Sequence, residues 1–144
     1  MTISPIAYKE VRTLRVVGIP RPQGRPRVFS DGGRVIAHSP KSSWYHLVYF
    51  EALKIRPLSP WAGPLGIDAT FIMPMPKSAP KKNPPFWAQK HIGDIDNFLK
   101  AVMDALTMAR WWGDDCQICE VFARKRYAQD NEAPGLEAAV YILS

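Results

Sequence analysis

Residues 91–115 read HIGDIDNFLKAVMDALTMARWWGDD, and this stretch predicts the central helix of the protein. After an extended entry, apolar residues recur three or four positions apart from Asp96 to Met108, the spacing of one face of an α-helix. The apolar stripe consists of Phe98, Leu99, Val102, Met103 and Leu106. We therefore expect an amphipathic helix that packs against a sheet through this stripe.

The same stretch concentrates negative charge in a basic protein. Five of the thirteen acidic residues lie within positions 94–115, although the net charge of the chain is +6. Neighbouring carboxylates raise each other's pKa unless a cation lies between them. The pattern indicates a divalent-metal site in a protein whose surface favours an anionic partner, with nucleic acid as the first candidate.

The remaining composition excludes several classes of protein. A hydrophobic content of 47% is typical of a globular chain and not of a disordered one. No apolar run approaches the roughly 18 residues of a membrane helix, and the first ten residues lack the pattern of a secretory signal. Two cysteines, Cys116 and Cys119, are too few for a disulfide framework. We expect a cytoplasmic protein without a membrane partner.

The flanking segments predict an α+β fold. Strands are expected over 10–19, 65–73, 118–127 and 136–143, with a hairpin across 30–33, a first helix from Ser39 as its N-cap to Ile55, and the last two strands as a closing pair. At 144 residues we expect one domain, residues 1–144, in which two main helices pack on one face of a mixed β-sheet.

Asp94 and Asp96 allow two interpretations. At alternate positions of an extended segment their side chains point the same way, which suits a shared metal ion. Near a helix N-terminus, either carboxylate is also stabilised by the free backbone N–H groups and the helix dipole. One of the two is then only a cap.

Asp96, Lys100 and Asp104 follow at intervals of four residues and therefore form one line along the helix. This line is either an ordinary surface ion-pair ladder or the arrangement that places Lys100 beside a scissile phosphate. Asp114 and Asp115 come just after the helix, and their spacing alone does not place them near Asp94. If they converge, such an all-oxygen cluster suits Mg²⁺ or Mn²⁺ better than zinc.

Three short runs with defined spacing lie in this region: Asp94-Ile95-Asp96-Asn97-Phe98-Leu99-Lys100, then Asp104-Ala105-Leu106, then Trp112-Gly113-Asp114-Asp115-Cys116-Gln117-Ile118. Together they resemble the signature of the RusA family of Holliday-junction resolvases. The resemblance covers about 25 residues and is far more specific than an isolated Asp-x-Asp. One departure is the run His91-Ile92-Gly93, where members of the family often carry basic residues or proline.

The resemblance implies a RusA-like fold and a Mg²⁺-dependent endonuclease, often encoded by prophages, that acts as a homodimer on four-way DNA junctions. By position, it implies that Asp94, Asp96 and Asp115 are metal ligands and that Lys100 is the catalytic lysine. Asp104 and Asp114 match the pattern without a clear role. A junction has near two-fold symmetry and needs two cuts, so a two-fold dimer suits the activity.

Two loops and one strand carry basic residues that are candidates for phosphate contacts. They are Arg21, Arg25 and Arg27 in the first loop, Lys77, Lys81, Lys82 and Lys90 in the second, and Arg124, Lys125 and Arg126 on the strand. Phe86-Trp87 in the second loop either stacks on an unpaired base or attaches the loop to the fold.

Trp111 and Trp112 are more typical of core or interface anchors than of base readers. The Cys116/Cys119 pair faces opposite sides of a strand, which argues against a zinc or redox site.

Two other functions compete with a junction resolvase. One is a branched-DNA-binding protein with the same fold and no activity, and the presence of all four implied site residues argues against it. The other is a Mg²⁺ enzyme acting on small phosphate esters or nucleotide sugars, which needs neither a basic surface nor two-fold pairing.

Overall fold

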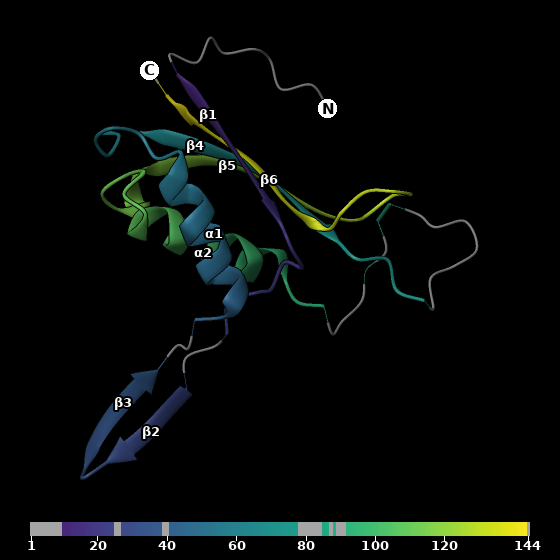
Figure 1. Ribbon diagram of the computed structural model, residues 1–144. Coiled ribbons are helices and arrows are strands. Elements are labelled where there is room, and N and C mark those ends of the chain that lie inside the picture. The colour runs from purple at the N-terminus through teal and green to yellow at the C-terminus, as the bar shows by residue number, and fades with distance from the viewer. Residues whose placement is uncertain are drawn as a thin grey trace.

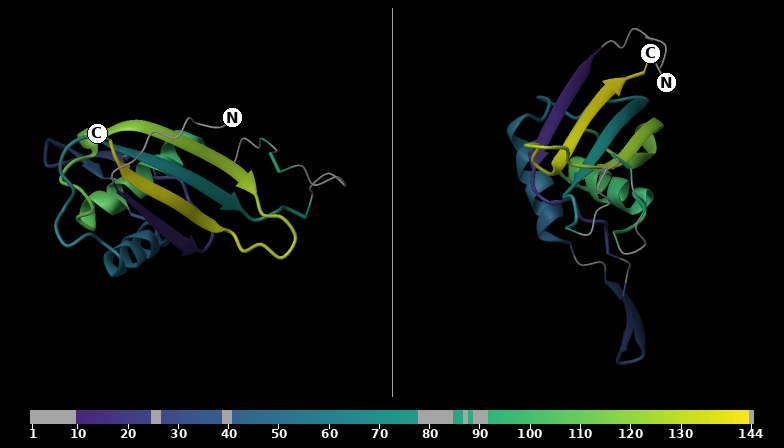
Figure 2. Two further views of the ribbon diagram at one scale, coloured as in Figure 1. Left: turned by 90° about the horizontal axis from the view of Figure 1, so that it is seen from above. Right: turned by 90° about the vertical axis from the view of Figure 1, so that its right-hand side faces the viewer.

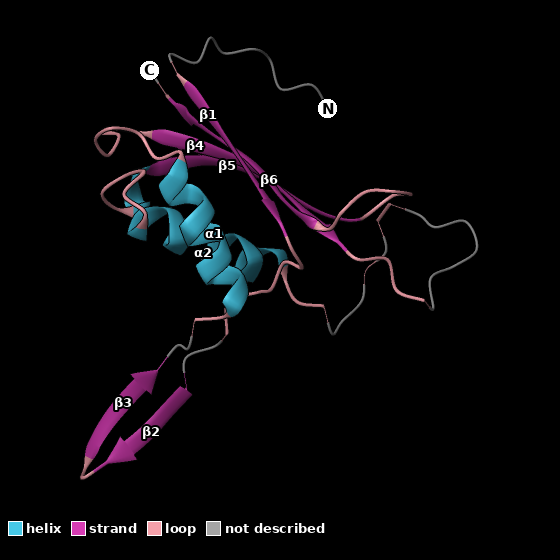
Figure 3. Cartoon of the chain, in the orientation of Figure 1, coloured by secondary structure: helices cyan, strands magenta, loops and turns pink. Residues whose placement is uncertain are grey.

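The structure, a computed structural model, describes residues 10–24, 27–38, 41–77, 85–86, 88 and 92–143. Its elements in chain order are β1 (Val11–Val17), β2 (Arg27–Asp31), β3 (Arg34–His38), α1 (Ser43–Lys54), β4 (Leu65–Met73), α2 (Ile95–Met108), a 3-10 turn η1 (Asp115–Gln117), β5 (Ile118–Tyr127) and β6 (Gly135–Ile142) (Figures 1 and 3). This set of strands and helices confirms the predicted α+β fold class.

The main sheet is mixed, with the strand order β1-β6-β4-β5. The central strand β4 is antiparallel to β6 and parallel to β5. The two last strands, predicted as a closing pair, are consecutive in sequence but separated in the sheet by β4. Because β4 and β5 are parallel, the chain must cross over between them, and α2 provides this crossover.

The core lies between one face of the sheet and the two helices, which Figures 1 and 2 show on the same side of the sheet. Alternate residues of β4 are fully buried on this face, namely Leu65, Ile67, Ala69 and Phe71. Phe71 packs against Phe98 of α2, with ring centroids 5.5 Å apart. The helix therefore anchors the sheet through the stripe that the sequence predicts.

The buried face of α2 is wider than the predicted stripe. Phe98, Val102 and Leu106 are fully buried as expected, but Leu99 and Met103 are only partly buried. Ala101 and Ala105 are buried as well. The helix packs against α1 in addition to the sheet, and small alanine side chains let two helices approach closely.

The prediction that Ser39 caps the first helix is wrong. α1 begins at Ser43, and its N-cap is Ser42, whose side-chain oxygen accepts a hydrogen bond from the backbone N–H of Tyr45. Both serines have the chemistry of an N-cap, so the presence of a proline after Ser39 was a misleading signal. The predicted end near Ile55 is confirmed, because Ile55 is the C-cap.

The hairpin of β2 and β3 is also confirmed, and Figure 1 shows it extending away from the sheet and helices.

Among the described helices, none has the length and apolar character that crossing a membrane requires.

The loop between β5 and β6 is closed by a bidentate ion pair between Arg126 and Glu132. Arg126 donates from Nη1 to Glu132 Oε1 at 2.6 Å and from Nη2 to Oε2 at 2.8 Å. The backbone N–H of Gln129 also donates to Glu132 Oε1, at 3.1 Å. These bonds to the ionised carboxylate, the one from Arg126 first, lower the pKa of Glu132 from 4.5 to about 2.

We expect Glu132→Gln to lower the free energy of unfolding by about 1–2 kcal/mol at pH 7. The folded pKa lies below the unfolded one, so the stabilisation is present above pH 4.5 and is lost as the pH falls toward about 2. Urea unfolding at several pH values measures this difference. Glu137→Gln is the control, because the Arg15–Glu137 pair is largely exposed and should contribute little. A Glu132→Gln deficit that stays constant down to pH 3 would contradict this account.

Candidate active site

α2 ends in a turn that reverses the chain. The backbone N–H of Trp111 donates to the Leu106 carbonyl at 3.1 Å, and that of Arg110 donates to the Thr107 carbonyl at 3.1 Å. This pair of bonds is the Schellman arrangement, which needs a left-handed residue after the C-cap. Arg110 occupies that position with φ of +67°, although glycine is the usual residue there.

The reversal is fixed by two fully buried tryptophans. Trp111 Nε1 donates to the Ala52 carbonyl of α1 at 3.0 Å, and the Trp111 carbonyl accepts the N–H of Trp61 at 2.9 Å. Trp112 is bridged to Trp61 and donates from Nε1 to Thr107. The interpretation of Trp111 and Trp112 as anchors and not base readers is confirmed.

The turn after Trp112 is shaped by Asp114 and Gln117. Asp114 Oδ1 accepts the N–H of Cys116 at 2.9 Å, while Gln117 Oε1 accepts the N–H groups of Gly113 and Asp114. Gln117 Nε2 donates to the carbonyls of Trp61 and Gly63. Asp114 is therefore a cap of η1, a role that the sequence left open. An Asp-x-x-Gln capping box was the signal for Gln117, and sequence reasoning missed it.

Asp115 points back to α2 and meets Lys100. Lys100 Nζ lies 3.2 Å from Asp115 Oδ2 and 2.9 Å from Asp104 Oδ1, and Lys41 Nζ lies 3.5 Å from Asp104 Oδ2. Thr107 Oγ1 contacts the other oxygen of Asp115 at 2.9 Å. The structure thus brings together Lys100, Asp104 and Asp115. The sequence placed Lys100 and Asp104 on one line of the helix but could not place Asp115 near them.

The charges of this cluster support one another. Hydrogen bonds to Asp104 and then to Asp115 raise the pKa of Lys100, so its amine stays protonated. Burial by itself raises the pKa of Asp115, but the bonds from Thr107 and Lys100 together outweigh burial and lower it. The cluster therefore holds a carboxylate and an ammonium group in their charged forms at neutral pH.

Asp94 and Asp96 lie at the N-terminal end of α2, one turn before Lys100. Asp94 is the N-cap by position, but its side chain makes no capping bond, whereas Asp96 Oδ1 accepts the N–H of Asn97 at 3.0 Å. Both aspartates are exposed. Asp96 therefore contacts the backbone of the first turn, and Asp94 lines a shallow groove of about 520 Å³ beside Ala123 of β5.

The entry to α2 is held by two contacts from distant segments. Gly93, with φ of +115°, places its carbonyl where Lys125 Nζ donates to it at 2.6 Å. A Cβ at this glycine would lie 2.9 Å from Pro22. The N–H of Gln23 donates to the Asn97 carbonyl at 3.0 Å. The loop that carries Arg21 therefore lies beside the aspartates.

The three implied ligands suit a hard divalent cation by their chemistry, because all are carboxylates. In the described part of the chain, however, no group of three or more His, Cys, Asp or Glu side chains lies close enough to hold a metal ion. Asp94 and Asp96 flank the first turn of α2, and Asp115 lies near Lys100, one turn beyond Asp96. The ammonium group of Lys100 already provides Asp115 with a cation.

The candidate DNA contacts divide into several groups. Arg21 and Lys77 are exposed, Arg27 begins β2, and Arg25, Lys81, Lys82 and Lys90 lie outside the described residues. On β5, Arg126 is bound to Glu132 and Lys125 is bound to the Gly93 carbonyl. These two cations hold the fold together, which leaves Arg124, an exposed residue, as the more available of the three.

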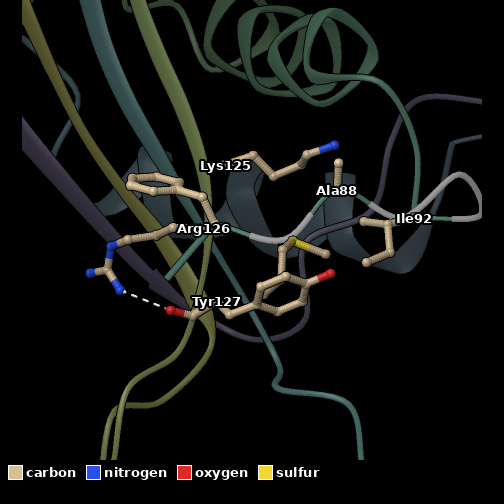
Figure 4. Close-up of a pocket in the computed structure, with 7 residues that line it drawn as sticks. Ala88, Ile92, Lys125, Arg126 and Tyr127 are labelled. Atoms are coloured by element: carbon tan, nitrogen blue, oxygen red, sulfur yellow. Dashed lines mark hydrogen bonds between the residues drawn. The ribbon is translucent and has the colours of Figure 1, made fainter. Parts of the chain in front are cut away.

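An apolar pocket of about 290 Å³ lies where β4 and β5 end (Figure 4). Met73, Phe86, Ile92 and Tyr127 contribute to its lining, and the N–H of Tyr127 donates to the Pro85 carbonyl at 2.9 Å. Figure 4 shows the amine of Lys125 directed away from Tyr127. The bond to Pro85 attaches this loop to the fold, whereas Phe86 itself is 59% exposed and Trp87 lies outside the described residues.

Among the described residues, neither cysteine belongs to a group of three or more His, Cys, Asp or Glu side chains. Cys116 and Cys119 are exposed free thiols. The neighbouring Asp114, which is hydrogen-bonded to Cys116, raises the pKa of that thiol and makes it less reactive.

Comparison with known proteins identifies the family of the chain. The sequence model of the family described as endodeoxyribonuclease RusA matches residues 18–140. The chain belongs to the RusA family. It is also 33% identical over 124 residues to the uncharacterized protein YqaN of Bacillus subtilis (strain 168), a match that covers 80% of this chain and 87% of that protein. Membership of the RusA family indicates an endodeoxyribonuclease that acts on branched DNA.

We expect Arg110→Gly to raise the free energy of unfolding by roughly 0.5–1 kcal/mol. Glycine removes a left-handed strain of about 1–2 kcal/mol, and its greater freedom in the unfolded chain offsets part of that gain. Urea unfolding with an unchanged m-value measures the effect. Asn131→Gly is the matched control, because Asn131 also has positive φ and asparagine tolerates this conformation better than arginine. A loss of stability in Arg110→Gly would show that the arginine side chain itself is needed.

Proposed function

We propose that this RusA-family chain is a Mg²⁺-dependent endonuclease, with Mn²⁺ as a substitute, that resolves four-way DNA junctions by paired symmetric cleavage in recombination and repair. The observation that carries the proposal is the contact of Lys100 on α2 with Asp115, 15 positions further along the chain. Asp94, the N-cap of the same helix, and Asp96 in its first turn precede Lys100. All four residues match the family signature by position, and membership of the family supports their common role.

Cleavage of a phosphodiester needs a nucleophilic water and stabilisation of the charge that develops on the phosphate oxygens. We assign Asp94, Asp96 and Asp115 as the residues that would hold the metal, which when bound supplies an activated water and Lewis-acid stabilisation. Lys100 is paired with Asp104 and Asp115, but about half of its side chain is exposed (52%), so its protonated amine can also meet a phosphate. Asp104 orients Lys100 through the bond of 2.9 Å.

We further propose that the enzyme acts as a homodimer. The two strands that must be cut are related by the near two-fold symmetry of a junction, and a two-fold dimer presents two copies of the site in the same relation. A bacterial cytoplasm, with a prophage or phage as the source of the gene, is the setting that this activity favours.

The first test compares a synthetic four-way junction with linear duplex, each with Mg²⁺ or with EDTA. We expect paired symmetric nicks in the junction with Mg²⁺ and none in the other three mixtures. Junction binding without nicks under all metal conditions would favour the non-catalytic DNA-binding protein. The absence of both binding and cleavage would leave the enzyme of small phosphate esters, which turnover of such an ester with Mg²⁺ then tests.

The same assay tests the site. Asp96→Asn keeps the side-chain size and an oxygen that accepts the Asn97 N–H, so it removes mainly the charge. We expect cleavage to fall by about 100-fold or more, while junction binding in EDTA is unchanged. Asp130→Asn, an exposed residue in the loop before β6, is the control and should cut at the wild-type rate. Full activity in Asp96→Asn would refute the assignment of this ligand.

The affinity for junctions should depend steeply on salt, because phosphate contacts release counterions. We expect Arg21→Ala and Lys77→Ala each to reduce the slope of log K against log salt by about 1. Lys54→Ala is the control, since Lys54 is paired with Glu51 on α1. Binding measured by fluorescence anisotropy at several salt concentrations gives the slopes, and an affinity that hardly changes from low to moderate salt would contradict the proposed basic surface.

A further inference from the structure

Thr107 contacts Asp115 but is not part of the family signature. Its Oγ1 lies 2.9 Å from Asp115 Oδ1, 2.8 Å from the Met103 carbonyl oxygen and 2.7 Å from Trp112 Nε1. Thr107 is partly buried, and Trp112 is fully buried. The contacts therefore form in a place where water competes little.

The donors and acceptors fix the direction of these bonds. An indole N–H only donates, so Trp112 uses one lone pair of the Thr107 hydroxyl. The single hydroxyl proton is then available to the Met103 carbonyl or to Asp115. A bond to an ionised carboxylate is the stronger of the two, because it is charge-assisted.

The two oxygens of Asp115 consequently have different partners. Thr107 holds Oδ1, and Lys100 approaches Oδ2. Lys100, Met103 and Thr107 lie at intervals of three and four residues, so they share one face of α2. This face acts as a rigid support along which the carboxylate from the following turn is aligned.

We propose that Thr107 is a positioning residue for Asp115: its hydroxyl, oriented by the indole N–H of Trp112, fixes the carboxylate so that Oδ2 is directed to Lys100 and the metal site. The inference rests on the proposed function, since it assigns Asp115 to that site. The competing structural role is a bond from Thr107 only to the Met103 carbonyl, a common contact of threonine within helices.

Three substitutions separate these roles. Thr107→Ser keeps the hydroxyl, Thr107→Val keeps the shape and removes it, and Thr107→Ala is used if the valine variant does not fold. Thr13→Val, on an exposed position of β1, is the matched control. Thermal unfolding establishes which variants are folded.

Two measurements then follow. One is junction cleavage with Mg²⁺, resolved into kcat and KM, and the other is binding of Mn²⁺ alone by electron paramagnetic resonance without DNA. For Thr107→Val or Thr107→Ala we expect kcat and Mn²⁺ affinity to fall about 10- to 100-fold, with KM and junction binding in EDTA unchanged. We expect Thr107→Ser to stay within about threefold of the wild type, as does Thr13→Val.

A folded Thr107→Val or Thr107→Ala variant with wild-type kcat and Mn²⁺ affinity overturns the inference. So does a Thr107→Ser variant that is as impaired as Thr107→Val, because the hydroxyl would then not be the group that matters. These results differ from failure of the proposed function, which is a wild-type protein that neither cuts junctions nor binds Mn²⁺.

Discussion

The left-handed turn at Arg110 is the constraint on which the site depends. Without this turn the chain would continue away from α2. With it, the chain reverses and buries Trp111 and Trp112 in the core. An arginine at positive φ costs about 1–2 kcal/mol, and burial of two large indoles that form hydrogen bonds more than offsets it. Packing therefore determines this turn against the local preference of its residue.

Because the chain turns back toward α2, the adjacent residues Asp114 and Asp115 make different contacts. Asp114 closes η1 with Gln117, whose amide also binds the segment 61–63, and this network fixes the backbone at Asp115. The carboxylate of Asp115 is then free to interact with α2. The backbone at Asp115 is thus positioned by hydrogen bonds that its neighbours Asp114 and Gln117 make.

Sequence reasoning recovered the elements better than their arrangement. The α2 stripe and the alternation in β4 are local periodic patterns set by burial, and they were predicted closely. The position of β4 between β5 and β6 is a nonlocal pairing that no local pattern encodes. The contact between Lys100 and Asp115 was equally out of reach, because it requires a left-handed residue where the sequence has arginine instead of glycine. Thr107 was missed because a threonine inside a helix has no distinctive pattern.

The charge distribution along α2 explains how one helix can support both groups of carboxylates. Asp94 and Asp96 lie at the N-terminal end, where the helix dipole and free N–H groups stabilise negative charge. Asp104 and Asp115 lie further along, where the dipole gives no such help, and there the ammonium group of Lys100 compensates them. Lys100 thus separates two anionic groups that would otherwise repel each other. Lys41 also contacts Asp104, at 3.5 Å, so Lys100 is the cation of Asp115 but not the sole cation of Asp104. A cation that took over Asp115 would therefore leave Lys100 held less tightly and able to turn toward a phosphate.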